Sequence, residues 1–115
     1  MEKYCISRDY TIKEAVECIE ENNNRIVLVL NENKKVIGVI SQGDIIRALL
    51  AGKNFYTRID DIIRSDFLYQ KEKDMEGAYK LFRKRKITLL PIVDDEFRLV
   101  DIITMDDIYC FMEEK

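Results

Sequence analysis

The two halves of the chain repeat one pattern of apolar residues at a constant offset of 63 positions, and residues 11–47 align with residues 74–110 without a gap. The identical pairs in this alignment are Ala15/Ala78, Ile40/Ile103, Asp44/Asp107 and Ile45/Ile108. Apolar positions keep the same phase throughout, which indicates an internal duplication. Each half is too small to bury its own apolar face, so we expect the two copies to pack together around a shared core.

Each half is predicted to form a helix, two strands and a second helix. Apolar residues at helical spacing predict a helix over 11–21, and Thr11 with Glu14 predicts a capping box at its start. After Arg25, the run 25–30 is continuously apolar and rich in β-branched residues, as in a strand buried on both faces. A turn at 31–35, a return strand over 36–41 and a helix from 44 to a stop at Gly52 follow. The second half repeats this order, with helices over 74–86 and 106–112 and strands over 88–93 and 99–104.

Composition narrows the functional classes. The 115 residues suit one compact domain, and a net charge of −3 provides no basic excess for binding nucleic acid. No apolar run approaches the roughly 20 residues of a membrane span, and residues 1–10 do not resemble a secretory signal. We therefore expect neither nucleic acid nor a membrane as partner.

The nucleophile and metal chemistry of the chain is also restricted. It contains no histidine, the commonest general base and metal ligand. Its cysteines, Cys5, Cys18 and Cys110, are odd in number and widely spaced, which fits reduced thiols in the cytoplasm. We expect a cytoplasmic, non-catalytic protein with no metal and no required cofactor; turnover of any nucleotide would restore the enzyme alternative.

Each half carries a hydroxyl residue and an aspartate three positions apart where its second strand runs into its second helix. These pairs are Ser41 with Asp44 and Thr104 with Asp107. A hydroxyl followed three residues later by a carboxylate is what a helix start needs for capping. A helix N-terminus also attracts anions. Capping and ligand binding are therefore both open and are compatible.

A run of four cations, Arg83 to Lys86, precedes the predicted strand 88–93. It can be the solvated C-terminal end of a helix, where cations are favourable. It can also supply guanidinium or ammonium groups to a phosphate near Thr104.

The duplicated junction, within "RIVLVLNENKKVIGVISQGDIIRAL" and "ITLLPIVDDEFRLVDIITMDDIY", resembles the CBS domain pair, also called a Bateman module. The resemblance implies an α+β fold of two pseudo-symmetric repeats, each ordered strand–helix–strand–strand–helix. It implies one module over 1–115, with repeats at about 1–55 and 56–115. Residues 58–70 then form the linker and the first strand of the second repeat.

The resemblance also implies site residues. In the family the motif aspartate usually holds ribose hydroxyls, which assigns Asp44 and Asp107. The motif hydroxyl lies near phosphate, which assigns Ser41 and Thr104. The residues just before the first hairpin strand face phosphate, and in the second repeat these are Arg85, Lys86 and Thr88; Asn22, Asn23 and Arg25 are their less charged counterparts in the first.

Two departures from the family pattern carry expectations of their own. Asp101 stands where the first repeat has Gly38, so one of the two sites is expected to be blocked. Lys34 and Phe97 stand where a turn glycine is common, so we expect longer or looser hairpin turns. Pro91, the single proline, instead matches a proline that the family has in this strand; it can also simply mark an edge or bulge position that tolerates a missing N–H.

The function that the resemblance implies is that of a sensor. Such a module binds a nucleotide such as AMP, ADP or ATP in a cleft between its repeats and controls an attached or partner enzyme. The stretches "VISQGDIIRALLAG" and "RLVDIITMDDI" resemble the CBS pair of bacterial sugar nucleotidyltransferases in particular. A homodimer through the helices at 44–50 and 106–112 is expected. The alternative is a ligand-free module for dimerisation or protein interaction.

Overall fold

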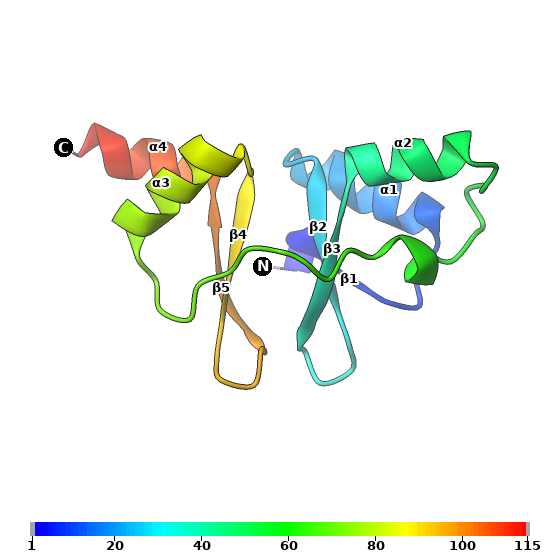
Figure 1. Cartoon of the computed structure of the whole chain (residues 1–115), viewed down its shortest axis with the longest axis horizontal. Coiled ribbons are helices and arrows are strands. Elements are labelled where there is room, and N and C mark those ends of the chain that lie inside the picture. The colour runs from blue at the N-terminus through cyan, green and yellow to red at the C-terminus, as the bar shows by residue number, and fades with distance from the viewer. Residues whose placement is uncertain (1, 115) are drawn as a thin grey trace. The chain divides into compact units, whose positions relative to one another are not determined.

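The computed structural model describes residues 2–114 and divides into two compact units, Met1–Phe67 and Leu68–Lys115 (Figure 1). Each unit contains an antiparallel hairpin and two α-helices that pack on it. The predicted α+β class is confirmed.

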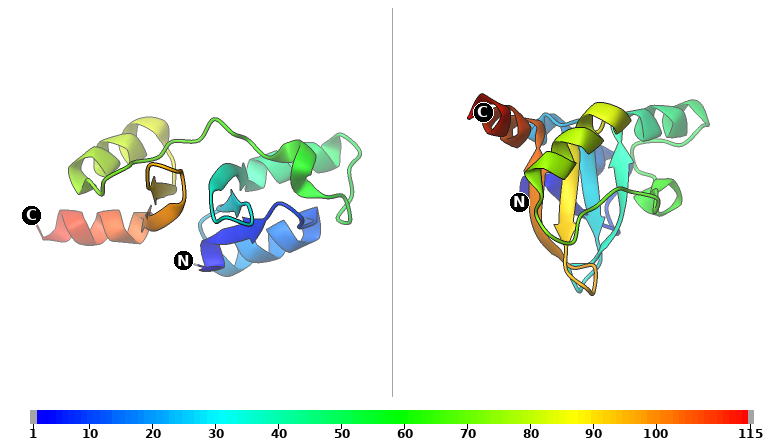
Figure 2. Two further views of the ribbon diagram at one scale, coloured as in Figure 1. Left: turned by 90° about the horizontal axis from the view of Figure 1, so that it is seen from below. Right: turned by 60° about the vertical axis from the view of Figure 1, so that its left-hand side comes forward.

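The first unit holds a three-stranded sheet in the order β1-β2-β3, with β1 parallel to β2 and β2 antiparallel to β3. Its elements are η1 (Glu2–Tyr4), β1 (Cys5–Ser7), α1 (Ile12–Asn22), β2 (Ile26–Leu30), β3 (Val36–Ser41), α2 (Gln42–Leu50) and η2 (Ile59–Ile62). Figure 2 shows α1 and α2 side by side. The predicted helices and strands of this half are confirmed to within about two residues at each end, the usual uncertainty of helix ends.

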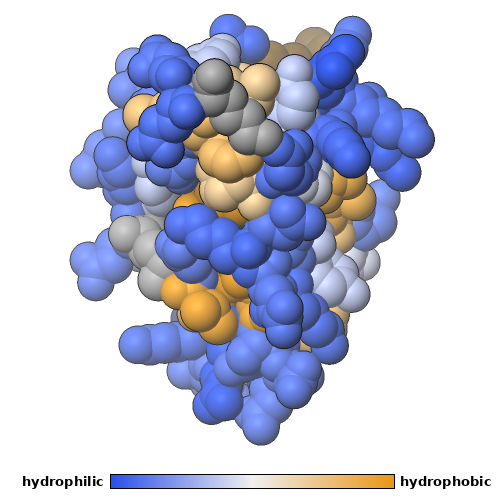
Figure 3. All heavy atoms as spheres, turned by 90° about the vertical axis from the view of Figure 1, so that its left-hand side faces the viewer, coloured by the Kyte–Doolittle hydropathy of each residue, from blue (hydrophilic) through white to orange (hydrophobic). Residues whose placement is uncertain are grey.

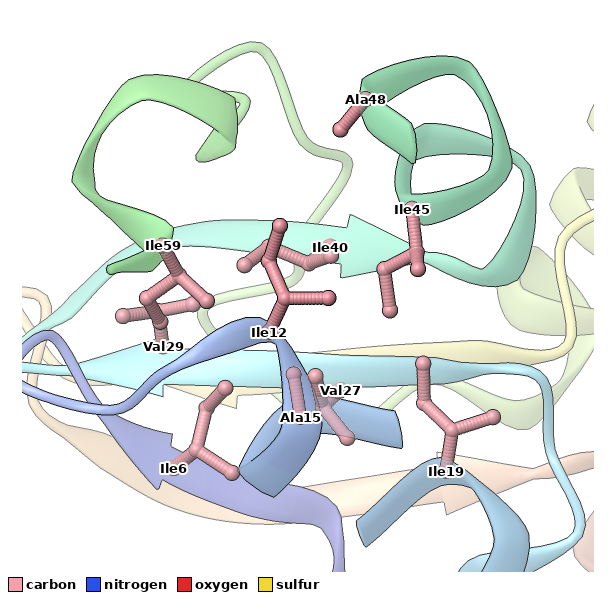
Figure 4. Close-up of a cluster of buried hydrophobic side chains, with 10 residues drawn as sticks. All are labelled: Ile6, Ile12, Ala15, Ile19, Val27, Val29, Ile40, Ile45, Ala48 and Ile59. Atoms are coloured by element: carbon pink, nitrogen blue, oxygen red, sulfur yellow. The ribbon is translucent and has the colours of Figure 1, made fainter. Parts of the chain in front are cut away.

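The core of the first unit lies between the sheet and its two helices (Figure 4). Ile12 and Ala15 of α1 meet Val27 and Val29 of β2, and Ile40 of β3 completes the layer; all five are fully buried. Because Leu28 is buried as well, β2 is covered on both faces, as its continuous apolar run predicted.

The second unit contains α3 (Met75–Arg85), β4 (Leu89–Val93), β5 (Leu99–Thr104) and α4 (Met105–Glu113). The two strands pair in register with Leu89 opposite Thr104. Its core repeats that of the first unit, because Ala78, Leu90 and Ile103 occupy the places of Ala15, Val27 and Ile40.

The strand predicted at the start of the second repeat is reduced to one parallel bridge between Gln70 and Ile92. The Gln70 side chain accepts a hydrogen bond from the backbone N–H of Asp74 at 3.1 Å and donates one to its carbonyl at 3.0 Å. These bonds turn the chain toward α3 and end the pairing with β4 early. Gln70 N–H donates to the carbonyl of Pro91, so the backbone of this proline faces the Gln70 side of β4, and its missing N–H removes no hydrogen bond to β5.

Part of the predicted linker joins the sheet of the first unit. Arg64 and Val39 exchange two backbone hydrogen bonds, at 2.9 and 3.0 Å, so residue 64 extends the sheet beside β3. This approach requires a glycine at position 38, because a Cβ there would lie 2.6 Å from the Arg64 carbonyl oxygen and would overlap the Ile63 side chain.

The hairpin turns are tight, so the expectation of looser turns was wrong. Lys34 and Phe97 both adopt a left-handed conformation with φ of 64°. Each turn is closed by the side chain at its first position: Oδ1 of Asn31 accepts hydrogen bonds from two backbone N–H groups, and Oδ1 of Asp94 does the same. Asn and Asp side chains stabilise turns in this way without a glycine.

Candidate functional site

Both strand-to-helix junctions form the capping box that their spacing predicted. Ser41 N–H donates to Oδ2 of Asp44 at 2.8 Å, and Asp44 N–H donates to the Ser41 hydroxyl oxygen at 3.1 Å. Thr104 and Asp107 repeat this exchange at 2.8 and 3.3 Å. The two junctions therefore have the same backbone frame, and they differ in what surrounds the carboxylate.

The Asp44 carboxylate is enclosed. Its side chain is 8% exposed, Arg47 pairs with Oδ1 at 2.9 Å, and Arg64 pairs with Oδ2 at 3.1 Å. Burial raises the pKa of Asp44, but hydrogen bonds from Ser41 and Arg47 and the charge of Arg64 outweigh it and lower the pKa below its ordinary value. Both oxygens of this carboxylate are thus occupied within the protein.

The Asp107 carboxylate is open. The residue is exposed, and its hydrogen bonds, from the N–H and the hydroxyl of Thr104, both end on Oδ2. Within residues 2–114 no arginine or lysine pairs with Asp107, and Oδ1 has no hydrogen-bond donor. A carboxylate oxygen in this state can accept hydrogen bonds from the hydroxyl groups of a ligand.

The register of the second hairpin brings the other predicted residues to this junction. Since Leu89 pairs with Thr104, the segment just before β4 lies at the same end of the hairpin as the start of α4. That segment contains Lys86, the left-handed C-cap of α3, and Thr88. Arg85 and Lys86 are exposed, and neither forms an ion pair with any residue of 2–114.

The corresponding segment of the first unit has a structural role. Asn22 occupies the position of Arg85 and is 4% exposed. Its amide donates to the carbonyls of Lys3 and Ile26, and its oxygen accepts from Asn24 N–H. The two units therefore differ at equivalent places. The first unit has a buried amide and a paired carboxylate, whereas the second unit has exposed cations and an open carboxylate.

Asp101, where the first unit has Gly38, is held within its own unit. Its Oδ2 pairs with Lys73 at 3.2 Å and its Oδ1 accepts from Ile102 N–H at 2.8 Å. The Ile102 hydrogen bond and the Lys73 charge lower the pKa of Asp101 against the opposing effect of burial. The expectation that this carboxylate blocks a site stays a prediction.

Sequence reasoning missed the arginines that enclose Asp44. Arg47 could have been found, because it follows Asp44 by three residues on the same helix. Arg64 carried no such signal, since it lies twenty positions away and reaches Asp44 through the backbone pairing with Val39.

Within the described part of the chain, no three cysteine, aspartate or glutamate side chains are grouped as metal ligands. The same residues contain no helix long and apolar enough to cross a membrane.

A duplicated α+β unit with a hydroxyl–carboxylate capping box at each strand-to-helix junction defines a tandem-repeat module. The chain belongs to the CBS domain family, which it matches over residues 1–51 and 59–114. CBS domain pairs are regulatory, non-catalytic modules that commonly bind adenosine nucleotides.

Two curated relatives are full-length enzymes. The chain is 31% identical over 107 residues to a homoserine O-acetyltransferase of Methanosarcina acetivorans, covering 91% of this chain and 19% of that protein. It is 32% identical over 106 residues to an inosine-5'-monophosphate dehydrogenase of Nitrosopumilus maritimus, covering 91% of this chain and 21% of the enzyme. The chain thus spans about a fifth of the length of these relatives.

Solved structures share the fold. An acetoin utilization protein, AcuB, of Vibrio cholerae is 26% identical and superimposes with a TM-score of 0.85, over 96% of this chain and 83% of that one. The cytosolic domain of the Mg²⁺ channel MgtE in complex with ATP is 26% identical with a TM-score of 0.74, over 96% of this chain and 45% of that one.

Proposed function

We propose that this chain is a regulatory module that binds an adenosine-type nucleotide at the junction of its second unit. The observation that carries the proposal is the open Oδ1 of Asp107, against the doubly paired carboxylate of Asp44. Asp107 then accepts hydrogen bonds from ribose hydroxyls. Thr104 and Thr88 lie on the phosphate side. Solved CBS neighbours that hold AMP or ATP support this ligand class.

Arg85 and Lys86 provide the positive charge that the phosphate groups need. Their side chains are exposed and are not neutralised by any carboxylate of residues 2–114. A charge-assisted hydrogen bond to phosphate is about twice as strong as a neutral one. The first unit has no such charge at the equivalent Asn22, so Ser41 and Asp44 are assigned to capping and a ligand role for them is the weaker prediction.

Regulation requires that the nucleotide stabilise one state of the protein more than another. We infer that binding at the second unit changes how the chain engages an attached or partner enzyme. Full-length relatives that carry this module as about a fifth of their length support control of an attached domain. A sugar nucleotidyltransferase as that enzyme, and a cytoplasmic location, remain predictions from the sequence.

The test is calorimetric titration with AMP, ADP and ATP of the native protein and a matched pair of variants. Asp107→Asn should weaken binding by about tenfold or more, because a charge-assisted hydrogen bond contributes roughly 1.5–3 kcal/mol. Asp44→Asn should leave the affinity within about twofold. Equal losses in both variants, or none in either, would contradict the assignment to the second unit.

A second pair of variants tests the phosphate contacts. Arg85→Gln with Lys86→Gln should weaken ATP more than AMP, because two further phosphates lose their cations. Lys80→Gln with Lys84→Gln removes the same charge from two other positions of α3 and serves as the control. Equal weakening by both pairs would indicate only long-range attraction.

A ligand-free interaction module is the second candidate. Exposed apolar side chains on α2 and α4 favour it, with Ile46 52% and Tyr109 58% exposed. A protein that dimerises but binds none of the three nucleotides in the titration would have this function.

A further inference from the structure

The second sheet ends at β5, whereas the first sheet continues beyond the equivalent strand β3. Val39 of β3 and Ile102 of β5 are equivalent under the 63-residue offset, and in both the backbone N–H points away from the preceding strand of the hairpin. The Val39 N–H donates to the carbonyl of Arg64 at 2.9 Å, so a further segment joins the first sheet. Among residues 2–114 no backbone segment pairs with this side of Ile102.

The side chain of Asp101 takes the place of the missing segment. Its Oδ1 accepts the hydrogen bond from Ile102 N–H at 2.8 Å, where the first unit uses the carbonyl of Arg64. Its Oδ2 pairs with Lys73 at 3.2 Å, which holds the carboxylate at the edge of the sheet. Because its donor is already bonded, this edge has no free N–H at Ile102 to offer an incoming strand.

Asp101 also excludes a strand by its bulk. Its equivalent in the first unit is Gly38, where a Cβ would lie 2.6 Å from the Arg64 carbonyl oxygen, closer than such atoms can approach. The first unit therefore accepts its additional segment only because residue 38 has no side chain. A side chain at position 101 prevents the same approach to β5. Charged residues on edge strands are a general means by which proteins avoid unwanted strand pairing.

The segment that joins the first sheet also brings a charge to the junction. Arg64 pairs through its guanidinium with Oδ2 of Asp44 at 3.1 Å. In the second unit no segment joins the sheet at Ile102, and Oδ1 of Asp107 has no hydrogen-bond donor among residues 2–114. The closed edge and the open carboxylate of the second unit therefore have one cause.

The contacts available to such a segment are mainly polar. On the side of the second unit that Figure 3 shows, hydrophilic side chains surround separate apolar patches. The segment in the first unit is held at Arg64 by two backbone hydrogen bonds and one ion pair. An extended peptide with an arginine at this position has the groups that the edge of β5 and Asp107 would need.

We propose that Asp101 closes the outer edge of β5 to an extended segment that carries an arginine, and thereby keeps Asp107 free for the nucleotide. The excluded partner is a strand like residues 61–66 of this chain, whose arginine would reach Asp107 as Arg64 reaches Asp44. Asp101 is a positioning residue in this role, because it acts through Asp107. The closure of the edge stands by itself, whereas its consequence for the nucleotide rests on the proposed function.

The first experiment asks whether the edge opens when residue 101 becomes glycine. A fluorescent peptide with the sequence of residues 61–66, DIIRSD, blocked at both ends, is titrated into the native protein and three variants. Asp101→Gly removes the carboxylate and the Cβ, whereas Asp101→Ala removes the carboxylate and keeps the Cβ. Asp95→Gly, at a hairpin-turn side chain that is 99% exposed, is the control for the loss of one negative charge.

Asp101→Gly should bind the peptide at least about tenfold more tightly than the native protein, because two backbone hydrogen bonds and an ion pair become available. Asp101→Ala and Asp95→Gly should bind as weakly as the native protein. A peptide with Arg64→Pro, which lacks the guanidinium and the N–H that pairs with Val39 in the first unit, should lose the gain. Equal affinity of all four proteins would overturn the proposal. Tight binding by both Asp101 variants would support closure by the carboxylate alone.

Hydrogen exchange measured by NMR does not depend on the affinity of a short peptide. In Asp101→Ala the amide of Ile102 loses its acceptor, so it should exchange at least about tenfold faster than in the native protein. The amide of Val39, which donates to Arg64, should exchange at the native rate and serves as the internal control. An unchanged rate at Ile102 would overturn the role of Asp101, whatever the peptide does. Circular dichroism checks that each variant remains folded.

Titration with AMP tests the consequence for the nucleotide. A saturating amount of the peptide should weaken AMP binding to Asp101→Gly by at least about tenfold, because the peptide's arginine then occupies Asp107. The peptide should leave AMP binding to the native protein unchanged. Equal AMP affinity of Asp101→Gly with and without bound peptide would overturn the link to Asp107. A protein that binds no nucleotide would contradict the proposed function alone, since the peptide and hydrogen-exchange measurements contain no nucleotide.

Discussion

Nε of Arg64 lies 3.1 Å from Oδ2 of Asp44, which joins the segment after the first unit's helices to the helix that follows β3. The pairing depends on Gly38, the residue that lets the backbone of Arg64 run beside β3. The equivalent carboxylate in the second unit, Asp107, has no such partner among residues 2–114. The two junctions, alike in their sequence motif, thus differ in electrostatic state.

We expect Asp44→Ala to destabilise the protein more than Asp107→Ala. Loss of the Asp107 side chain removes part of a cap, about 1 kcal/mol. Loss of Asp44 should cost about 2–3 kcal/mol in all, because it also leaves the Ser41 N–H unpaired in a half-buried junction and two arginines close together. The arginines are half exposed or more, so their ion pairs add little. Urea unfolding measures the loss of unfolding free energy in Asp44→Ala and in Asp107→Ala. Equal losses in the two variants would show that Asp44 acts as a cap alone.

The stability that Asp44 contributes should disappear in acid. Its pKa is lowered in the folded protein, so the unfolded chain binds the proton more tightly than the folded one. The contribution is complete above the unfolded pKa of about 3.9 and is lost as the pH falls through the lower folded value. Unfolding free energies of native protein and Asp44→Asn should therefore differ by a constant amount near neutral pH and converge below about pH 4. A difference unchanged down to the acid transition would contradict this.

The three thiols should react at different rates. Burial raises the pKa of Cys5 to about 11 and also raises the pKa of Cys18, to which the nearby Glu21 adds. Cys110 is exposed on α4. Since the thiolate is the reactive form, alkylation at mildly alkaline pH should label Cys110 first and Cys5 last. Mass spectrometry of partly labelled protein gives the order, and the same experiment in denaturant should remove it.

Substitution by alanine should have different effects on stability at Gly38 and at Gly43. A Cβ at Gly38 overlaps Ile63 and the Arg64 carbonyl, which belong to a packed segment, so Gly38→Ala should cost about 1–3 kcal/mol. A Cβ at Gly43 meets the Arg47 guanidinium at 3.2 Å, at the end of an exposed and flexible side chain. Because alanine favours the helix by up to about 1 kcal/mol, Gly43→Ala should be neutral or stabilising. Thermal denaturation of the two variants compares them directly, and a tolerated Gly38→Ala would show that the linker is free to move.

Sequence reasoning predicted the local structure well. Helix starts at Thr11, Ser41 and Thr104 were found from residues three positions apart, because capping involves only one turn of backbone. Hairpins and core positions followed from hydrophobic periodicity repeated at a fixed offset. The first strand of the second repeat is shorter than predicted, since the bonds of Gln70 to Asp74 that end it early leave no periodic signal.

The sequence by itself determined which elements form, where each helix begins and that two equivalent junctions exist. It could not determine which junction keeps an open carboxylate, because that depends on groups far apart in the chain. Asp44 is enclosed since the Val39–Arg64 pairing carries a guanidinium to it, and Asp107 stays open since no residue of 2–114 reaches it with a positive charge. Tertiary structure decided this, because an ion pair requires proximity in space and a sequence motif records only proximity along the chain.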